Sequence, residues 1–170
     1  MAEGSPTAAL GSTQAYEAAR LRWGVESDAE ALATLWREAF EADGRTDADS
    51  ETPAALREWI EHGGVVLLED DHHVALCAIR WRWHQDGWMI DPIATRPGAR
   101  GQGFGRWLMT KLEALAIKRN VPTLRLFLER QDLAPYYRRL GYVQDDAANE
   151  PNLWVKRVGG TWQRQTEAAS

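Results

Sequence analysis

A glycine-rich stretch, Arg96 to Gly105, lies between an apolar segment and a long amphipathic one. The preceding segment, Trp88 to Thr95, predicts a strand, and the following one, Gly103 to Arg119, predicts a helix because its apolar residues recur at helical spacing. Glycines at a helix N-terminus expose backbone N–H groups beside the positive end of the helix dipole, a combination that binds phosphate. The stretch therefore predicts a strand–turn–helix unit with an anion site at its turn.

The segments before this stretch predict two further helices and several strands. Ser27-x-x-Glu30 has the pattern of a capping box and begins an amphipathic helix that Asp43-Gly44 ends. Thr52-Pro53 begins a shorter helix that ends near His62. Strands are expected over 21–25, 65–68, 74–83 and 88–95. Polar turns separate the last three, so these should be antiparallel neighbours.

The segments after the long helix change the expected topology of the sheet. A strand is expected over 123–128, a helix over 132–140 and a last strand over 153–158. A strand–helix–strand order implies a parallel pair, so the sheet should be mixed and covered by helices. We expect an α/β (α+β) fold with a central, mostly antiparallel sheet of six to seven strands, wrapped by about four helices.

All predicted elements fall within residues 19–160, which a single domain of ordinary size accommodates. Residues 1–18 are small, polar and alanine-rich without clear periodicity, and we expect them to form a flexible leader. Residues 161–170 are expected to be a flexible tail. We therefore expect one domain between two flexible ends.

The composition limits the compartments in which the protein is expected and the classes of partner it is expected to bind. The net charge of −5 argues against a nucleic-acid binder that works by bulk electrostatics. The N-terminus lacks a signal peptide pattern and no apolar run reaches membrane-spanning length, so no membrane partner is expected. The single cysteine, Cys77, favours a reducing compartment. His72-His73 has no second ligand cluster at metal-binding spacing and is interpreted as a polar turn, so no metal is expected. We expect a cytoplasmic protein.

Two common phosphate-binding motifs do not fit the glycine-rich stretch. A P-loop needs Lys and Ser or Thr after its last glycine, but Arg106-Trp107 follows Gly105. A dinucleotide fingerprint, Gly-x-Gly-x-x-Gly, fails from Gly101 and from Gly103, because neither count meets a glycine at the third place. Both nucleotide-binding classes are excluded on these letters.

The stretch resembles the motif of the GNAT acetyltransferases, (Gln/Arg)-x-x-Gly-x-(Gly/Ala), through Arg100, Gly103 and Gly105. Further on, Tyr137-x-x-x-Gly141-Tyr142 is similar to the family's later helix with its tyrosine and its Gly-aromatic ending. The two motifs stand in the family's order, and the resemblance extends over about 21–158. It implies the GNAT fold, with the parallel pair splayed at the coenzyme site, and acetyl-CoA as co-substrate.

The resemblance also implies roles for particular residues. Backbone amides of the glycine-rich turn would hold the coenzyme pyrophosphate, and the strand before it would bond the pantetheine as an added strand does. Tyr137 would protonate the departing thiolate. The implied coenzyme-binding residues are Ile93, Ala94, Thr95, Arg100, Gly101, Gln102, Gly103, Phe104, Gly105, Arg106 and Tyr137.

The general base departs from the family's pattern. Where the family often has a glutamate on the strand, this chain has Met89, and the family's asparagine near the later helix is missing. Asp91 and Glu129 are the nearest candidate bases, each acting through water. These departures keep open a second reading, in which the domain binds acyl-CoA as a sensor without turnover. A protein-interaction domain is a third alternative.

The acceptor is expected to be a primary amine. Acidic residues gather in the segments Glu41 to Glu51 and Gln144 to Glu150, which in the family border the acceptor pocket. A cationic amine of a small molecule or peptide is therefore the expected acceptor. Whether two copies form a homodimer is left open.

Overall fold

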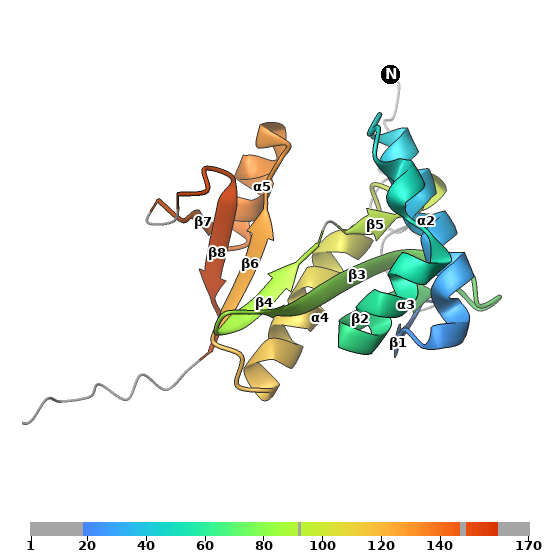
Figure 1. The fold of residues 1–170 in the computed structure, drawn as a ribbon, viewed down its shortest axis with the longest axis horizontal. Coiled ribbons are helices and arrows are strands. Elements are labelled where there is room, and N and C mark those ends of the chain that lie inside the picture. Colours follow the sequence, from blue (N-terminus) through green and yellow to red (C-terminus); the bar gives the residue numbers. More distant parts are fainter. Residues whose placement is uncertain (1–18, 92, 147–148, 160–170) are drawn as a thin grey trace, which may run out of the picture.

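The computed structural model describes residues 19–91, 93–146 and 149–159 (Figure 1). The expected leader and tail, and the Pro92 position, lie outside the described residues. The strands are β1 Arg20–Trp23, β2 Gly63–Glu69, β3 Ala75–His84, β4 Gly87–Ile90, β5 Ala94–Thr95, β6 Thr123–Phe127, β7 Val143–Gln144 and β8 Leu153–Arg157. The helices are α2 Ala29–Ala42, α3 Pro53–His62, α4 Phe104–Lys118 and α5 Ala134–Arg139, with 3-10 turns η1 Glu26–Asp28, η2 Ala48–Ser50, η3 Pro97–Ala99 and η4 Gln131–Leu133.

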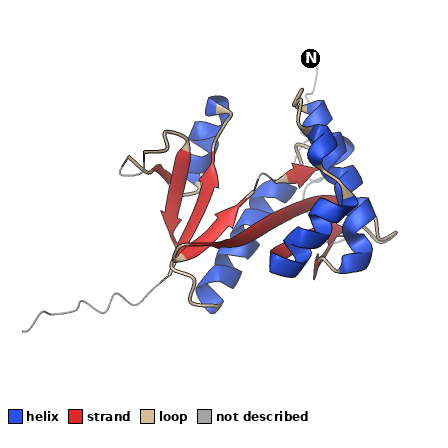
Figure 2. Cartoon of the chain, in the orientation of Figure 1, coloured by secondary structure: helices blue, strands red, loops and turns tan. Residues whose placement is uncertain are grey.

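The strands form one mixed sheet in the order β1-β2-β3-β4-β6-β8-β7, with β5 paired to β3 (Figure 2). Within the described residues only β4 and β6 run parallel, which confirms the expected mostly antiparallel sheet with one parallel pair. The sheet has eight strands instead of six to seven, because two of them, β5 and β7, are only two residues long. Such short strands leave no period in the sequence to detect.

The segment expected as one strand over 88–95 is divided in two. β4 pairs with β3 through Trp81 and Ile90, whereas β5 pairs with β3 through Ala78 and Ala94. Between these two pairs β3 advances by three residues, whereas the segment from Ile90 to Ala94 advances by four. One extra residue is therefore accommodated before β5, as in a β-bulge. The parallel ladder between β4 and β6 ends at Ile90, while β6 continues to Phe127. The two parallel strands therefore part at this point.

Helices cover both faces of the sheet, and the alternation of β2 shows how. Val66 and Leu68 point into a core that includes Leu108 of α4, whereas Val65 and Leu67 point into a second core with α2. Successive side chains of a strand face opposite sides, so a run of apolar residues is required where both sides are covered. α5 packs on the first core through Ala134 and supports the β6–β8 pair (Figure 1).

The start of the first helix differs from the expected capping box. The side chain of Asp28 accepts a hydrogen bond from the Val25 amide at 2.8 Å, and η1 occupies the residues between them before α2 begins at Ala29. The prediction of a Ser27–Glu30 box was therefore wrong by two residues. The carboxylate of Asp28 also binds Arg22 of β1, and this extra contact favours the earlier start.

Tyr142, just after α5, provides a stability prediction. Its side chain is buried and its hydroxyl has no hydrogen-bond partner among the described residues. An unpaired buried polar group costs about 1–3 kcal/mol. Tyr142→Phe should therefore keep or raise the free energy of unfolding, measured by urea denaturation. A loss above about 1 kcal/mol would contradict an unpaired hydroxyl.

Candidate active site

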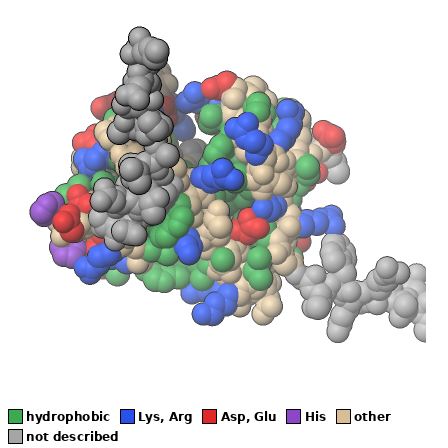
Figure 3. Space-filling view, turned by 180° about the vertical axis from the view of Figure 1, so that it is seen from behind, with side chains coloured by type: hydrophobic (Ala, Val, Ile, Leu, Met, Phe, Trp, Pro, Cys, Tyr) green, Lys and Arg blue, Asp and Glu red, His purple; other side chains and the backbone are tan. Residues whose placement is uncertain are grey.

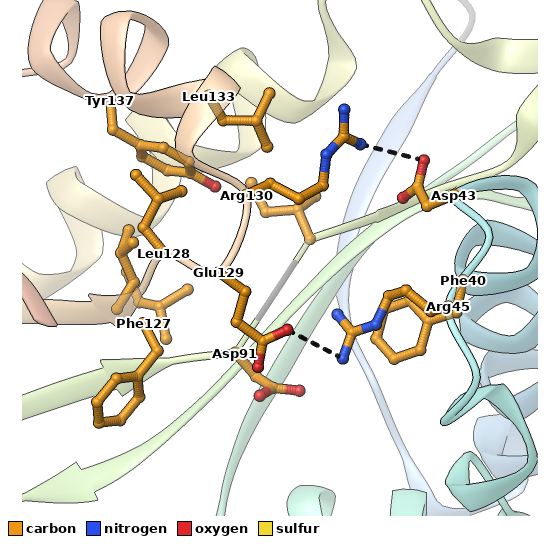
Figure 4. Close-up of a pocket in the computed structure, with 13 residues that line it drawn as sticks. Phe40, Asp43, Arg45, Asp91, Phe127, Leu128, Glu129, Arg130, Leu133 and Tyr137 are labelled. Atoms are coloured by element: carbon orange, nitrogen blue, oxygen red, sulfur yellow. Dashed lines mark hydrogen bonds and ion pairs between the residues drawn. The ribbon is translucent and has the colours of Figure 1, made fainter. Parts of the chain in front are cut away.

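A cavity opens where β4 and β6 part (Figure 4). One wall comes from the end of α2 and the loop after it, and the other from the end of β6 and the start of α5. The cavity is lined by Phe40, Asp43, Arg45, Ile90, Asp91, Ile93, Leu126, Phe127, Leu128, Glu129, Arg130, Leu133 and Tyr137. All three predicted catalytic residues, Tyr137, Asp91 and Glu129, line this cavity.

The glycine-rich turn has the backbone that its sequence requires. Gly101 has φ 77° and Gly103 has φ 83°, both in the left-handed region that a side chain disfavours. Gly103 is the N-cap of α4, and no side chain caps this end. The first turn of a helix presents N–H groups without partners inside the helix, and the dipole adds positive charge there. The turn can therefore hold an anion.

Gly105 leaves a gap between α4 and the segment around β5. A Cβ atom built on Gly105 would lie 3.9 Å from Cγ2 of Ile93 and from Oγ1 of Thr95. β5 pairs with β3 alone among the described strands, so its other edge is available to an extended ligand. The Ala94 side chain instead packs into the α2 core with no exposed surface, so any part it has in binding belongs to its backbone.

Arg96 and the expected coenzyme-binding residue Arg100 both bind α2, and Arg100 also binds its C-cap. Arg96 donates to Glu38 at 3.1 Å, and Arg100 donates to Asp43 at 2.8 Å and to the Ala39 carbonyl at 3.0 Å. These bonds attach the glycine-rich turn to the C-terminal half of α2. Of the other predicted turn residues, Phe104 is part of the core, whereas Gln102 and Arg106 are exposed.

The Tyr137 hydroxyl points into the cavity while its ring packs on the core (Figure 4). The ring makes edge-to-face contacts with Tyr136 and Tyr142, at centroid distances of 5.1 and 5.8 Å. The Tyr142 amide donates to the Tyr137 carbonyl at 3.0 Å, which joins α5 to the chain after it. Burial raises the pKa of Tyr137 to about 12. The phenol is thus protonated at neutral pH and can donate a proton or a hydrogen bond.

Asp91 follows β4 and belongs to a buried ionic group. Nε of Arg80 donates to its Oδ2 at 2.5 Å, and the same guanidinium donates to both oxygens of Glu51 at 2.6 and 2.9 Å. Arg80 lies between the rings of Trp36 and Trp59. Burial raises the pKa of Asp91, and the neighbouring Arg80 opposes that rise. An aspartate with a raised pKa, facing a cavity, is suited to accept a proton.

Glu129 differs from Asp91 in its surroundings. Its side chain is 71% exposed, and its contact is an ion pair with Arg45 at 3.9 Å. Figure 4 shows that it reaches toward Arg45 across the cavity. The structure thus brings both candidate bases to one cavity from two different strand ends, but only Asp91 is held by buried partners.

Sequence reasoning missed Arg80, Glu51 and Arg45. One signal was present for Arg80, since a charged residue within the apolar run of β3 requires a buried partner. Its partner Glu51 is 29 residues away in an irregular loop, so no spacing rule identifies it. Met89, at the place of the family's glutamate, is buried.

Other classes of site find no support in the described part of the chain. No three His, Cys, Asp or Glu side chains gather there as they do around a metal ion. None of its helices combines the length and apolarity needed to cross a membrane. Basic and acidic side chains are interspersed on the face shown in Figure 3.

The sequence was compared with models of known families. The model described as acetyltransferase (GNAT) family matches residues 29–142, which is more than half of the chain. The chain belongs to the GNAT acetyltransferase family. No curated protein matches the sequence.

Solved GNAT structures share this fold. The PaiA N-acetyltransferase of Thermoplasma acidophilum, in complex with coenzyme A, has a TM-score of 0.71 at 16% identity and covers 82% of this chain and 98% of its own. A GNAT acetyltransferase of Brucella melitensis, in complex with acetyl-CoA, has a TM-score of 0.67 at 18% identity, covering 84% and 89%. A GNAT N-acetyltransferase of Escherichia coli, in complex with CoA, has 0.65 at 20%, covering 83% and 82%. The predicted GNAT fold is thereby confirmed.

Proposed function

We propose that this GNAT protein moves an acetyl group from acetyl-CoA to a primary amine of a small molecule or peptide by direct attack in a ternary complex. The observation that carries the proposal is the single cavity that a phenol, Tyr137, and a carboxylate with a raised pKa, Asp91, share beside the glycine-rich turn. Acyl transfer to nitrogen needs one group that accepts a proton and one that donates a proton.

Coenzyme binding is proposed along the turn and the free edge of β5. The amides at the start of α4 would hold the pyrophosphate, and Ile93 and Thr95 would bond the pantetheine as an added strand. The Ile93 amide would also polarise the thioester carbonyl. The three structural neighbours that contain coenzyme A or acetyl-CoA support this assignment by their shared fold.

The proposed reaction forms a C–N bond, breaks a C–S bond and moves protons through two side chains. The neutral amine nitrogen attacks the thioester carbon and forms the C–N bond. Asp91 accepts a proton from that nitrogen through water, and the C–S bond breaks. The Tyr137 hydroxyl gives its proton to the departing thiolate. Asp91 then releases its proton to solvent and the phenol takes one up from solvent, so that both side chains return to their starting states. The products are the N-acetyl amine and free CoA.

One observation favours an alternative, an acyl-CoA-binding sensor without turnover. The usual position of the family's base is Met89, which is buried and cannot act on an acceptor. Incubation with acetyl-CoA and a panel of amines separates the two. Under the proposed function, free CoA thiol appears together with an acetylated amine identified by mass spectrometry. Binding of acetyl-CoA without either product would favour the sensor.

The acceptor side leads to a prediction on salt and pH. If the acceptor is a cationic amine, kcat/KM should fall as salt rises, since the Debye length shrinks from about 10 Å at 0.1 M to about 3 Å at 1 M. The rate should rise with pH above neutrality, because an amine with a pKa near about 10 must lose its proton before attack. Steady-state kinetics with sodium chloride between these limits tests the first expectation, and the same kinetics at a series of pH values tests the second. If kcat/KM does not change with salt concentration, the acceptor is neutral.

A further inference from the structure

Two arginines are each shared by two carboxylates, and the two groups are built alike. Arg45 lines the cavity, and Arg80 contacts the lining residue Asp91. In each, a carboxylate from the loop between α2 and α3 takes the guanidinium in a bidentate contact. In each, a second carboxylate lines the cavity. The groups are Arg80 with Glu51 and Asp91, and Arg45 with Asp47 and Glu129.

In the first group Glu51 satisfies most of the guanidinium. It accepts from both terminal nitrogens of Arg80, while Asp91 contacts the guanidinium from the Nε side with Oδ2. Glu51 is 5% exposed, but the Asp91 side chain is 29% exposed and faces the cavity. The single positive charge of Arg80 thus faces the two negative charges of Glu51 and Asp91. The excess negative charge lies on Asp91, at the cavity.

In the second group Asp47 satisfies Arg45. It accepts from Nε at 2.8 Å and from a terminal nitrogen at 2.5 Å, while the guanidinium lies 3.8 Å from the centre of the Phe40 ring. A terminal nitrogen of the same arginine lies 3.9 Å from Oε2 of Glu129. A contact this long to an exposed carboxylate is worth about 1 kcal/mol or less. Glu129 therefore carries a largely uncompensated charge at the cavity.

The remaining charges of the cavity compensate one another. Arg130 binds Asp132 at 2.7 Å and lies 3.4 Å from Asp43, and Asp43 accepts from Arg100 at 2.8 Å. These linked ion pairs hold six carboxylates and four arginines, of which Asp43, Asp91, Glu129, Arg45 and Arg130 line the cavity. The two excess carboxylates, Asp91 and Glu129, come from the ends of β4 and β6, the strands that part there.

We propose that the acceptor carries a second cationic group besides the amine that is acetylated, and that Glu129 binds it. This inference rests on the proposed function, in which Asp91 serves the reacting amine. A monoamine would compensate one of these two carboxylates and leave Glu129 with Arg45 at 3.9 Å as its cationic contact. A diamine compensates both. The acceptor class is therefore a diamine or a longer polycationic amine.

Three acceptors of equal chain length test this assignment: butylamine, butane-1,4-diamine and 4-aminobutanoate. They differ only in the far group, which is neutral, positive or negative. At low salt we expect kcat/KM for the diamine to exceed that for butylamine by about fivefold, beyond the statistical advantage of two equivalent amino groups. The amino acid should be the poorest. A preference for butylamine or for 4-aminobutanoate would overturn the proposal.

Two variants examine the two members of the second group separately. Glu129→Gln should lower the diamine-to-butylamine ratio of kcat/KM by about fivefold. Asp47→Asn should lower it as well, although Asp47 does not line the cavity, because Arg45 is then free to compensate Glu129. Asp49→Asn is the matched control, since Asp49 is exposed on the same loop; its ratio should stay near that of the wild type. A ratio unchanged in Glu129→Gln would overturn the assignment.

Binding measurements separate this inference from the proposed reaction. Calorimetry of butane-1,4-diamine with the wild type and with Glu129→Gln, both with CoA present, needs no turnover. Weaker diamine binding in the variant without acetylation in either protein would sustain dication recognition and reject acetyl transfer. Acetylation of all three amines at similar rates would sustain the transfer and reject the second cationic group.

Discussion

Gly105→Glu should abolish coenzyme binding and leave the fold intact. Gly105 has no positive φ, and its Cβ would meet nothing closer than 3.9 Å, so the chain itself accommodates a side chain there. A carboxylate is also favourable in the first turn of a helix. The same carboxylate would occupy the space proposed for the pyrophosphate and repel it. Losing two charge-assisted hydrogen bonds at about 1.5–3 kcal/mol each weakens binding on the order of 10²-fold or more.

The choice of position and control makes the measurement decisive. Gly103→Glu would be ambiguous, since φ of 83° strains any side chain and the fold itself would suffer. Thr110→Glu places the same charge on α4, about 140° round the helix from Gly105, at an exposed position. Calorimetry with CoA should show normal affinity for Thr110→Glu and none for Gly105→Glu. Equal affinities in the two variants would remove the glycine turn as the coenzyme site.

Tyr137→Phe should lower kcat on the order of 10²-fold and leave the affinity for acetyl-CoA unchanged. The variant removes only the hydroxyl, because the ring packs on the core and its aromatic contacts are kept. General acid catalysis contributes about 10²- to 10⁴-fold, and a loss confined to the transition state appears in kcat. With the pKa of Tyr137 raised to about 12, the phenol stays protonated over the pH range in which an amine acceptor loses its proton.

Tyr142→Phe is the matched control for that variant. Tyr142 contacts the same ring from the end of α5, and its hydroxyl is buried without a partner in the described residues. The control should retain full turnover, measured as CoA release. Near-normal turnover in Tyr137→Phe would mean that the thiolate departs unaided or that another group donates the proton. Equal losses in both variants would point to a general disturbance of α5.

The sequence was informative where structure depends on local backbone and periodicity. Gly101 and Gly103 stand where φ is positive, so the letters themselves predicted the turn. The strand–helix–strand order of the second half predicted a mixed sheet covered by helices. The position of Tyr137 followed from the Gly141-Tyr142 ending of its helix. These features need only neighbouring residues to be recognised.

The features of the site that the sequence did not predict depend on contacts between residues that are distant in the sequence. The loop between α2 and α3 contributes Asp47 and Glu51 to the site only because Arg45 and Arg80 bind them, and a surface acid and a buried acid have the same letter. The segment Glu41 to Glu51 was therefore predicted to attract a cationic acceptor, whereas Asp43, Asp47 and Glu51 each bind arginine. Charge compensation is a tertiary property, and the letters of one segment do not show it.

The short parallel ladder between β4 and β6 has a consequence for the life of the protein in a cell. Among the described residues, three pairs join β4 to β6 there and connect the two parts of the sheet. A ligand that bonds in the gap beyond them contacts both parts, and it stabilises the folded chain by about 2.7 kcal/mol when its concentration is a hundred times Kd. Proteases act on the unfolded fraction, so a change of this size alters how long a chain survives. The abundance of the protein would then follow the supply of its own ligand.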